Sequence, residues 1–331
     1  MSALVSPGSS AHAHRNAVLM LLLANLLWGL SFPVIKALTL VHVSLLPGSG
    51  NWFITSMTVA PRFLLAVAIL LLWRGRSLLS SSASEWRQGL WLGCFAGGGM
   101  LFQNDGLQFT DASVSAFLTQ LYAILIPLWV AARTRRNPGW RIWCCCALVL
   151  TGAAVLGRFD WHTLSLGRGE IETLVSSVFF MGQILTLERP CFAGNRALNI
   201  TFVMLLTELV LFSFMAFSVA PSPSSLLVFW GSLPWVGMTL MLTVFCTLGA
   251  FLLMNLYQPR ISATEAGLIY CVEPIFGSLM ALCLPALLSL WAGIAYANES
   301  ASWTLLLGGG LITAANVWMQ WPRKAPAVAA S

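Results

Sequence analysis

Two acidic residues lie deep inside long apolar stretches of this chain. They are the residues best suited to bind a cationic group or a proton. Glu273 is followed directly by Pro274, whereas Glu208 lies in an apolar run without proline. A charged side chain at the centre of a bilayer costs roughly 2.5–3.5 kcal/mol, so each carboxylate should face protein or water. We expect Glu273 to line a cavity and either hold a cationic group or carry a proton. For Glu208, a cavity and a structural role remain equal alternatives.

Two prolines are predicted to break the helices that carry this chemistry. Pro274 should free the carbonyl of Tyr270, and Pro127 should free that of Ala123, because proline removes a helical hydrogen bond. Paired interruptions in two halves of a membrane protein point to a solute site near the bilayer midplane.

Five further in-span polar residues are amides, and they predict no catalytic chemistry. Each can join helices by about 0.6 kcal/mol without a substrate. The amides are Asn25, Gln103, Asn104, Gln183 and Asn255. No HExxH, GxSxG or GKS/T motif occurs, and most of the eight cysteines lie in apolar runs without paired CxxC motifs. We therefore expect no enzyme activity, no metal and no cofactor.

The composition places these residues in a membrane. The chain of 331 residues is 58% hydrophobic and 8% charged, with a mean hydropathy of +0.82. A soluble domain carries roughly 25% charged residues, so lipid must replace water around most of this surface. The net charge of +6 does not indicate a nucleic-acid partner, because the basic residues lie between apolar stretches.

Ten apolar stretches are long enough, or nearly so, to span a bilayer as helices. The predicted fold is therefore an all-α membrane protein with ten transmembrane helices. The stretches are Ala17–Leu40, Ile54–Trp73, Gly89–Asn104, Ala112–Ala132, Trp140–Leu156, Ile171–Leu187, Leu198–Val219, Leu233–Tyr257, Ala263–Leu284 and Trp303–Trp321.

The basic residues predict the orientation. With the N-terminus in the cytoplasm, only Lys36, Arg62, Arg158 and Arg168 of the 17 lysines and arginines fall outside. Such asymmetry fits an even number of spans with both termini cytoplasmic. The first apolar stretch is longer than a signal-peptide core, so we expect it to remain as a span. The predicted location is the cell (inner) membrane.

Ten spans divide into two halves of five. Because each half has an odd number of spans, the two halves have opposite orientations in the membrane. A shift of 151 residues aligns Ala112–Ala132 with Ala263–Cys283 and pairs Tyr122 with Glu273. We expect two inverted five-helix repeats. Their predicted boundaries are a cytoplasmic tail 1–15, a first repeat 16–157, a linker 158–168, a second repeat 169–321 and a cytoplasmic tail 322–331.

Four segments resemble the EamA-like family of the drug/metabolite transporter superfamily. They are LLLANLLWGLSFPVIKAL (Leu21–Leu38), QNDGLQFTDASVSAFLTQLYAILIPL (Gln103–Leu128), GEIETLVSSVFFMGQILTLER (Gly169–Arg189) and ATEAGLIYCVEPIFGSLMA (Ala263–Ala281). The resemblance implies a central cavity with alternating access and the export of a metabolite, amino acid or drug-like solute. By motif, Trp28, Gln120, Tyr122, Gln183, Tyr270 and Glu273 would lie near that cavity. The segments Val41–Thr55 and Pro285–Ser302 are longer than in that family.

Other functions remain as alternatives. A membrane-embedded enzyme acting on lipid or isoprenoid substrates would need clustered acids at one membrane face, where Asp105 and Asp111 are the nearest candidates. A membrane subunit without transport activity would not require paired prolines beside a buried acid. The expected partners are a small-molecule solute and the lipid bilayer, with a proton as one candidate coupling ion and no nucleic acid.

Overall fold

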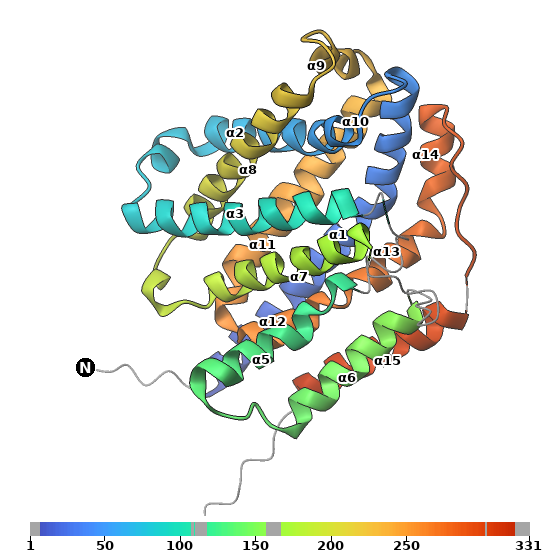
Figure 1. Ribbon diagram of the computed structural model, residues 1–331. Coiled ribbons are helices and arrows are strands. Elements are labelled where there is room, and N and C mark those ends of the chain that lie inside the picture. Colours follow the sequence, from blue (N-terminus) through green and yellow to red (C-terminus); the bar gives the residue numbers. More distant parts are fainter. Residues whose placement is uncertain (1–6, 107–108, 110–117, 157–166, 302, 322–331) are drawn as a thin grey trace, which may run out of the picture.

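A computed structural model describes residues 7–106, 109, 118–156, 167–301 and 303–321 of the chain, and all regular structure within them is helical (Figure 1). The first residues of the predicted fourth span, 112–117, lie outside the described residues. So do Asp111, Arg158, nearly all of the predicted linker and the tail 322–331.

The first half of the chain forms five helical elements in the described residues. They are α1 (Pro7–Leu45), α2 (Asn51–Leu79), α3 (Ala83–Gly106), α5 (Tyr122–Thr134) and α6 (Trp140–Leu156). The segment expected to connect the first two spans, Val41–Thr55, is mostly helical in the structure. Fully buried His42 anchors the extension of α1, since its Nε2 accepts a hydrogen bond of 2.7 Å from Trp235 Nε1.

The second half contains more and shorter helical elements. They are α7 (Arg168–Leu187), η1 (Pro190–Phe192), α8 (Ala197–Val219), α9 (Ser225–Val228), η2 (Phe229–Gly231), α10 (Leu233–Met241), the π-helix η3 (Leu242–Gly249), α11 (Ala250–Tyr257), η4 (Gln258–Arg260), α12 (Ala263–Tyr270), α13 (Glu273–Ala281), α14 (Leu284–Ala292) and α15 (Trp303–Gln320). The long segment Pro285–Ser302 thus begins within a helix, α14.

The helices make the chain an integral membrane protein. Every stretch predicted to span the bilayer contains helical residues. By length and hydropathy, five described helical segments are sufficient to cross a membrane: His12–Leu45, Asn51–Leu79, Arg168–Leu187, Ala197–Val219 and Leu233–Arg260. A sixth candidate is Ala263–Ala281 together with α14, which is bent by 57°.

Local sequence explains where several helices begin. Ser82 and Glu85 form a reciprocal capping pair at the start of α3, with the Ser82 amide 2.8 Å from Glu85 Oε2 and the Glu85 amide 3.2 Å from Ser82 Oγ. Ser262 caps α12 through a single bond, which its Oγ accepts from the Glu265 amide at 3.2 Å. These polar caps fix the ends of otherwise apolar segments.

The packing brings distant segments side by side. The main pairs are α2 with α8, α3 with α7 and α8, α1 with α11 and α13, α5 with α12, and α6 with α15. Figure 1 shows α6 and α15 running together along one edge of the molecule. Close packing of α3 and α7 depends on glycine, because a Cβ at Gly98 or Gly99 would lie 2.3 and 2.5 Å from the rings of Phe179 and Phe180.

Candidate functional site

Two short turns interrupt helices at matching positions in the two halves. Residues 120–121 form a turn before α5, and residues 271–272 form a turn between α12 and α13. The amide of Leu121 bonds to the Leu118 carbonyl at 3.2 Å, and the amide of Val272 bonds to the Ile269 carbonyl at 3.1 Å. Leu118 and Ile269, like Leu121 and Val272, are separated by 151 residues.

The backbone pattern continues with the same spacing beyond both turns. The Leu121 carbonyl accepts from Ile124 and Leu125, both at 3.0 Å. The Val272 carbonyl accepts from Ile275 at 3.0 Å and from Phe276 at 3.5 Å. These donors again differ by 151 residues.

The prolines relate to these turns differently from what the sequence predicts. Pro274 directly follows Glu273 in the first turn of α13, where a missing amide is tolerated. Pro127 instead lies inside the continuous helix α5. The interruption expected at Pro127 is therefore found at Gln120 and Leu121, a place that no proline marks. Prediction from proline alone missed it because short turns need no special residue.

Glu273 is the first residue of α13 and the central side chain of the candidate site. It is half-buried, and no hydrogen bond or ion pair of its carboxylate is found among the described residues. Glu273 interacts electrostatically with Tyr122 of α5 and with Cys246 of η3. The Tyr122 hydroxyl donates to Gln120 Oε1 at 3.0 Å. The structure thus brings Gln120, Tyr122 and Glu273 together where α5 crosses the broken helix.

Trp28 and Tyr270 form the second part of this site. Their rings meet edge to face with centroids 5.6 Å apart, and Phe251 lies at the same distance from Trp28. The Tyr270 hydroxyl donates to Gln258 Oε1 at 2.9 Å, and Gln258 Nε2 donates to the Ile184 carbonyl at 2.7 Å. Tyr270 is therefore fixed by a residue that the sequence analysis did not single out.

Gly29 explains why Trp28 can lie so close to the broken helix. A Cβ at Gly29 would be 2.6 Å from Phe276 Cβ and 2.9 Å from the Gly277 amide. Only glycine permits this approach of α1 to α13 without a shift of one helix.

Gln183 lies elsewhere. Its buried side-chain amide is 3.9 Å from the sulfur of Met204 and 3.8 Å from that of Met254, which are weak acceptors. Among the described residues, no hydrogen bond joins it to Glu273. In the described structure Gln183 connects α7 with α8 and α11.

The secondary amides mostly bond within or between neighbouring helices. Asn25 donates to the Leu21 carbonyl at 2.7 Å, while its buried Oδ1 has no partner. Gln103 donates to Thr119 Oγ1 at 3.2 Å, which ties α3 to the turn before α5. Asn104 donates to the Met100 carbonyl at 2.7 Å.

Glu208 and Arg62 form a separate buried group. Glu208 of α8 is 0% exposed and Arg62 of α2 is 5% exposed. Arg62 interacts electrostatically with Glu208. Arg62 is thus enclosed between helices, while its predicted place on the outer side of the membrane stays a prediction. Counting basic residues did not reveal this burial, although Arg62 lies near the middle of the predicted span Ile54–Trp73.

Two ion-pair clusters lie at opposite ends of α3. Glu85 accepts from Arg196 Nε at 2.8 Å and from Nη2 at 3.0 Å, which lowers the pKa of its carboxyl to about 2. At the other end, Arg168 pairs with Asp105 and, at 2.8 Å, with Glu172. Asp105 is thus held by a salt bridge, and Glu172 bonds to the same arginine.

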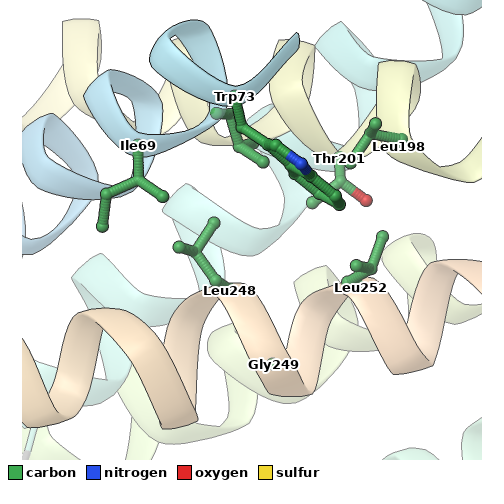
Figure 2. Close-up of a pocket in the computed structure, with 8 residues that line it drawn as sticks. Ile69, Trp73, Leu198, Thr201, Leu248, Gly249 and Leu252 are labelled. Carbon is green, nitrogen blue, oxygen red and sulfur yellow. The ribbon is translucent and has the colours of Figure 1, made fainter.

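A groove lies apart from all of these polar residues. It holds a volume of about 260 Å³ between α2, α8, η3 and α11. Figure 2 shows Ile69 and Trp73 on one side and Leu248 and Leu252 on the other. The walls are apolar, with Thr201 as the polar exception. This surface suits a hydrocarbon chain rather than a polar solute.

Comparisons with known proteins agree with the resemblance in the sequence. Residues 15–158 match the EamA-like transporter family, which belongs to the drug/metabolite transporter superfamily. A solved structure described as "Crystal structure of protein" superposes with a TM-score of 0.64 at 18% identity, over 93% of this chain and 97% of that chain. That likeness concerns the fold alone. Among curated proteins, none matches this chain.

Proposed function

We propose, on the premise of the match over residues 15–158, that this integral membrane protein is a secondary transporter for a small solute. It moves the solute across the cytoplasmic membrane by alternating access, and we propose export as the direction. Both termini lie in the cytoplasm in this proposal. No covalent chemistry is required of any residue described above.

Helix pairing supports two inverted five-helix repeats. In such repeats α1 corresponds to α7, α3 to α11 and α5 to α13. The contact of α3 with α7 then corresponds to that of α11 with α1, and the contact of α5 with α7 corresponds to that of α13 with α1. Each of these pairs packs in the structure. Three further packed pairs each join one predicted span to its counterpart in the other half. They are α2 with α8, α5 with α12 and α6 with α15. The turns 151 residues apart support the same arrangement.

The position of Glu273 is the observation that carries the proposal. A half-buried carboxylate without a hydrogen-bond partner lies at a helix interruption, between the two halves. An ionisable group at such a place in a membrane costs free energy. Groups of this kind mark the binding sites and pathways of solutes and ions. Trp28, Tyr122 and Tyr270 supply aromatic surface beside it. This combination fits a small solute with a cationic group, or a site that carries a proton.

Reconstitution tests this function directly. The purified protein is placed in proteoliposomes, a mixture of small metabolites is added, and the trapped solutes are identified by mass spectrometry with and without a pH gradient. We expect at least one solute to accumulate above the level in protein-free vesicles. Equal contents in both kinds of vesicle, with folded protein present in the membrane, would reject transport of the solutes in that mixture.

A control separates the candidate site from the rest of the protein. Glu172→Gln changes an acid that already has a salt-bridge partner at a helix end. It should leave uptake near the wild-type level, whereas changes at Glu273 should not.

A further inference from the structure

Glu208 is an acid that the site around Glu273 does not use. It is the twelfth residue of the 23-residue helix α8, near the helix centre, and its side chain is 0% exposed. Neither carboxylate oxygen has a hydrogen-bond partner in the described structure. A buried ionised carboxylate without hydrogen bonds is strongly disfavoured, so the geometry requires either a proton on Glu208 or a nearby positive charge.

Arg62 supplies that charge from the facing helix. It is 5% exposed, lies on α2, and its Nε has no partner. Arg62 and Glu208 lie on packed helices, where Phe63 of α2 stacks on Phe212 of α8 with ring centroids 6.5 Å apart, yet no nitrogen–oxygen contact within 4.0 Å joins the two side chains. The two groups are therefore close enough to attract each other and are not bonded in this structure.

The other helices around Glu208 offer no competing counter-ion. The position of a Cβ on Gly97 of α3 lies 3.7 Å from Glu208 Cγ, so α3 presents backbone there. Cys246 of η3 is a buried thiol that interacts electrostatically with both Arg62 and Glu273. The titratable groups elsewhere on α3 and α11 lie at helix ends, bond to other residues or are exposed; they are Glu85, Arg87, Cys94, Asp105 and Tyr257.

We propose that Glu208 is a proton-binding site with Arg62 as its switchable counter-ion, distinct from the solute site at Glu273. In the arrangement described, Glu208 holds the proton and Arg62 makes no ion pair; its guanidinium lies 5.2 Å from the centroid of the Phe63 ring. When the proton leaves, the carboxylate draws the guanidinium into a direct ion pair, which satisfies both groups. The ligand is a proton rather than a metal cation, because the positive charge of Arg62 repels a bound cation.

The exchange has a structural consequence. Forming the ion pair pulls α2 and α8 together at their centres, and binding a proton releases them. Because α2 also packs against η3 and α10, this movement reaches the helices beside Glu273. The role in coupling rests on the proposed transport function, whereas proton binding by Glu208 does not.

Infrared difference spectroscopy of the protein in lipid bilayers tests the site without any solute. Spectra at a series of pH values, in H2O and D2O, report the carbonyl stretch of protonated carboxyl groups. We expect a titrating carboxyl band that is lost in Glu208→Gln and kept in the matched variant Glu273→Gln. An unchanged carboxyl spectrum in Glu208→Gln would overturn the proposal. Loss of the band on adding Na⁺ at constant pH would also overturn it.

Variants of Arg62 test whether this residue is the counter-ion of Glu208. This test remains valid if Glu208→Gln fails to fold. Arg62→Lys keeps a positive charge and should retain the titration with a shifted midpoint. Arg62→Met removes the charge, so the band should persist at all pH values at which the protein stays folded. A titration in Arg62→Met that matches the wild type would contradict the proposed pairing. Failed solute uptake with an intact Glu208 titration would reject the transport function and leave the proton site standing.

Discussion

Tyr122 and Glu273 are the first residues of two helices that each follow a two-residue turn, and they are separated by 151 residues. The two side chains also interact electrostatically. Equivalent positions of the two halves therefore meet at one place in the molecule. One half supplies a phenol there and the other a carboxylate, so the site is symmetric in backbone and asymmetric in chemistry.

The prolines should have unequal effects on transport. Pro274→Ala restores an amide beside the turn at residues 271–272 and lets α12 and α13 merge, so we expect uptake to fall about tenfold or more. Pro127→Ala acts inside the helix α5, which is already continuous, so it removes no turn and should reduce uptake by less than about threefold. Uptake by reconstituted protein, normalised to membrane abundance, measures both. Equal losses would show that the turn has no special role.

Gly29→Ala should destabilise the contact of α1 with α13. The added Cβ would lie 2.6 Å from Phe276 Cβ, and overpacking of this kind costs about 1–3 kcal/mol. Gly310→Ala is the matched control, because nothing lies within 4 Å of its Cβ position. Thermal unfolding in detergent should show a lower midpoint for Gly29→Ala and an unchanged or higher one for Gly310→Ala. The reverse order would contradict this packing.

The Glu85–Arg196 pair should make stability depend on pH at the acid end. Glu85 accepts five hydrogen bonds, from Ser82, Asn199 and three donors of Arg196, and the pKa of its carboxyl falls from 4.5 to about 2 on folding. A lowered folded-state pKa adds stability above pH 4.5 that is lost as the pH falls toward 2.

The matching variant is Glu85→Gln. We expect the wild type to exceed it by on the order of 1–2 kcal/mol at pH 7, because solvent around Arg196 weakens the pair. Unfolding midpoints of both proteins between pH 7 and pH 2 should converge as the pH falls through the range below 4.5. A constant difference over this range would show that the charge of Glu85 is not what stabilises the fold.

Much of the architecture is predictable from sequence, because an apolar stretch of about 20 residues has few alternatives to a helix in lipid. The position of Glu273 next to a helix interruption is predictable for the same reason, since Pro274 marks it. The turn at Gln120 is not predictable from the sequence, because it depends on packing between α5 and α12. The burial of Arg62 is also not predictable, since it depends on α8, a helix far away in sequence. The Gln258–Tyr270 bond likewise depends on tertiary contacts.

Site-resolved labelling tests the proposed topology. Cys191 is exposed in the segment between α7 and α8, which the proposal places in the cytoplasm. Ser222→Cys introduces a thiol in the exposed segment before α9, which it places outside. An impermeant maleimide added to intact cells should modify position 222 and reach Cys191 only after permeabilisation, as read by peptide mass spectrometry. Modification of Cys191 in intact cells would exclude cytoplasmic termini joined to ten spans.

The role of Glu273 is the central claim, and a pair of variants tests it. Glu273→Gln keeps the shape of the side chain and removes its charge, while Glu273→Ala also removes its bulk. Abundance of folded protein in the membrane is measured for each variant, so that a loss of folding is not mistaken for a loss of function.

The deciding measurement is gradient-driven uptake by proteoliposomes containing Glu273→Gln at wild-type protein abundance. We predict that accumulation driven by the pH gradient falls at least tenfold, because neither a cationic group nor a proton can be held without the carboxylate. Accumulation at the wild-type level would contradict a functional role for Glu273.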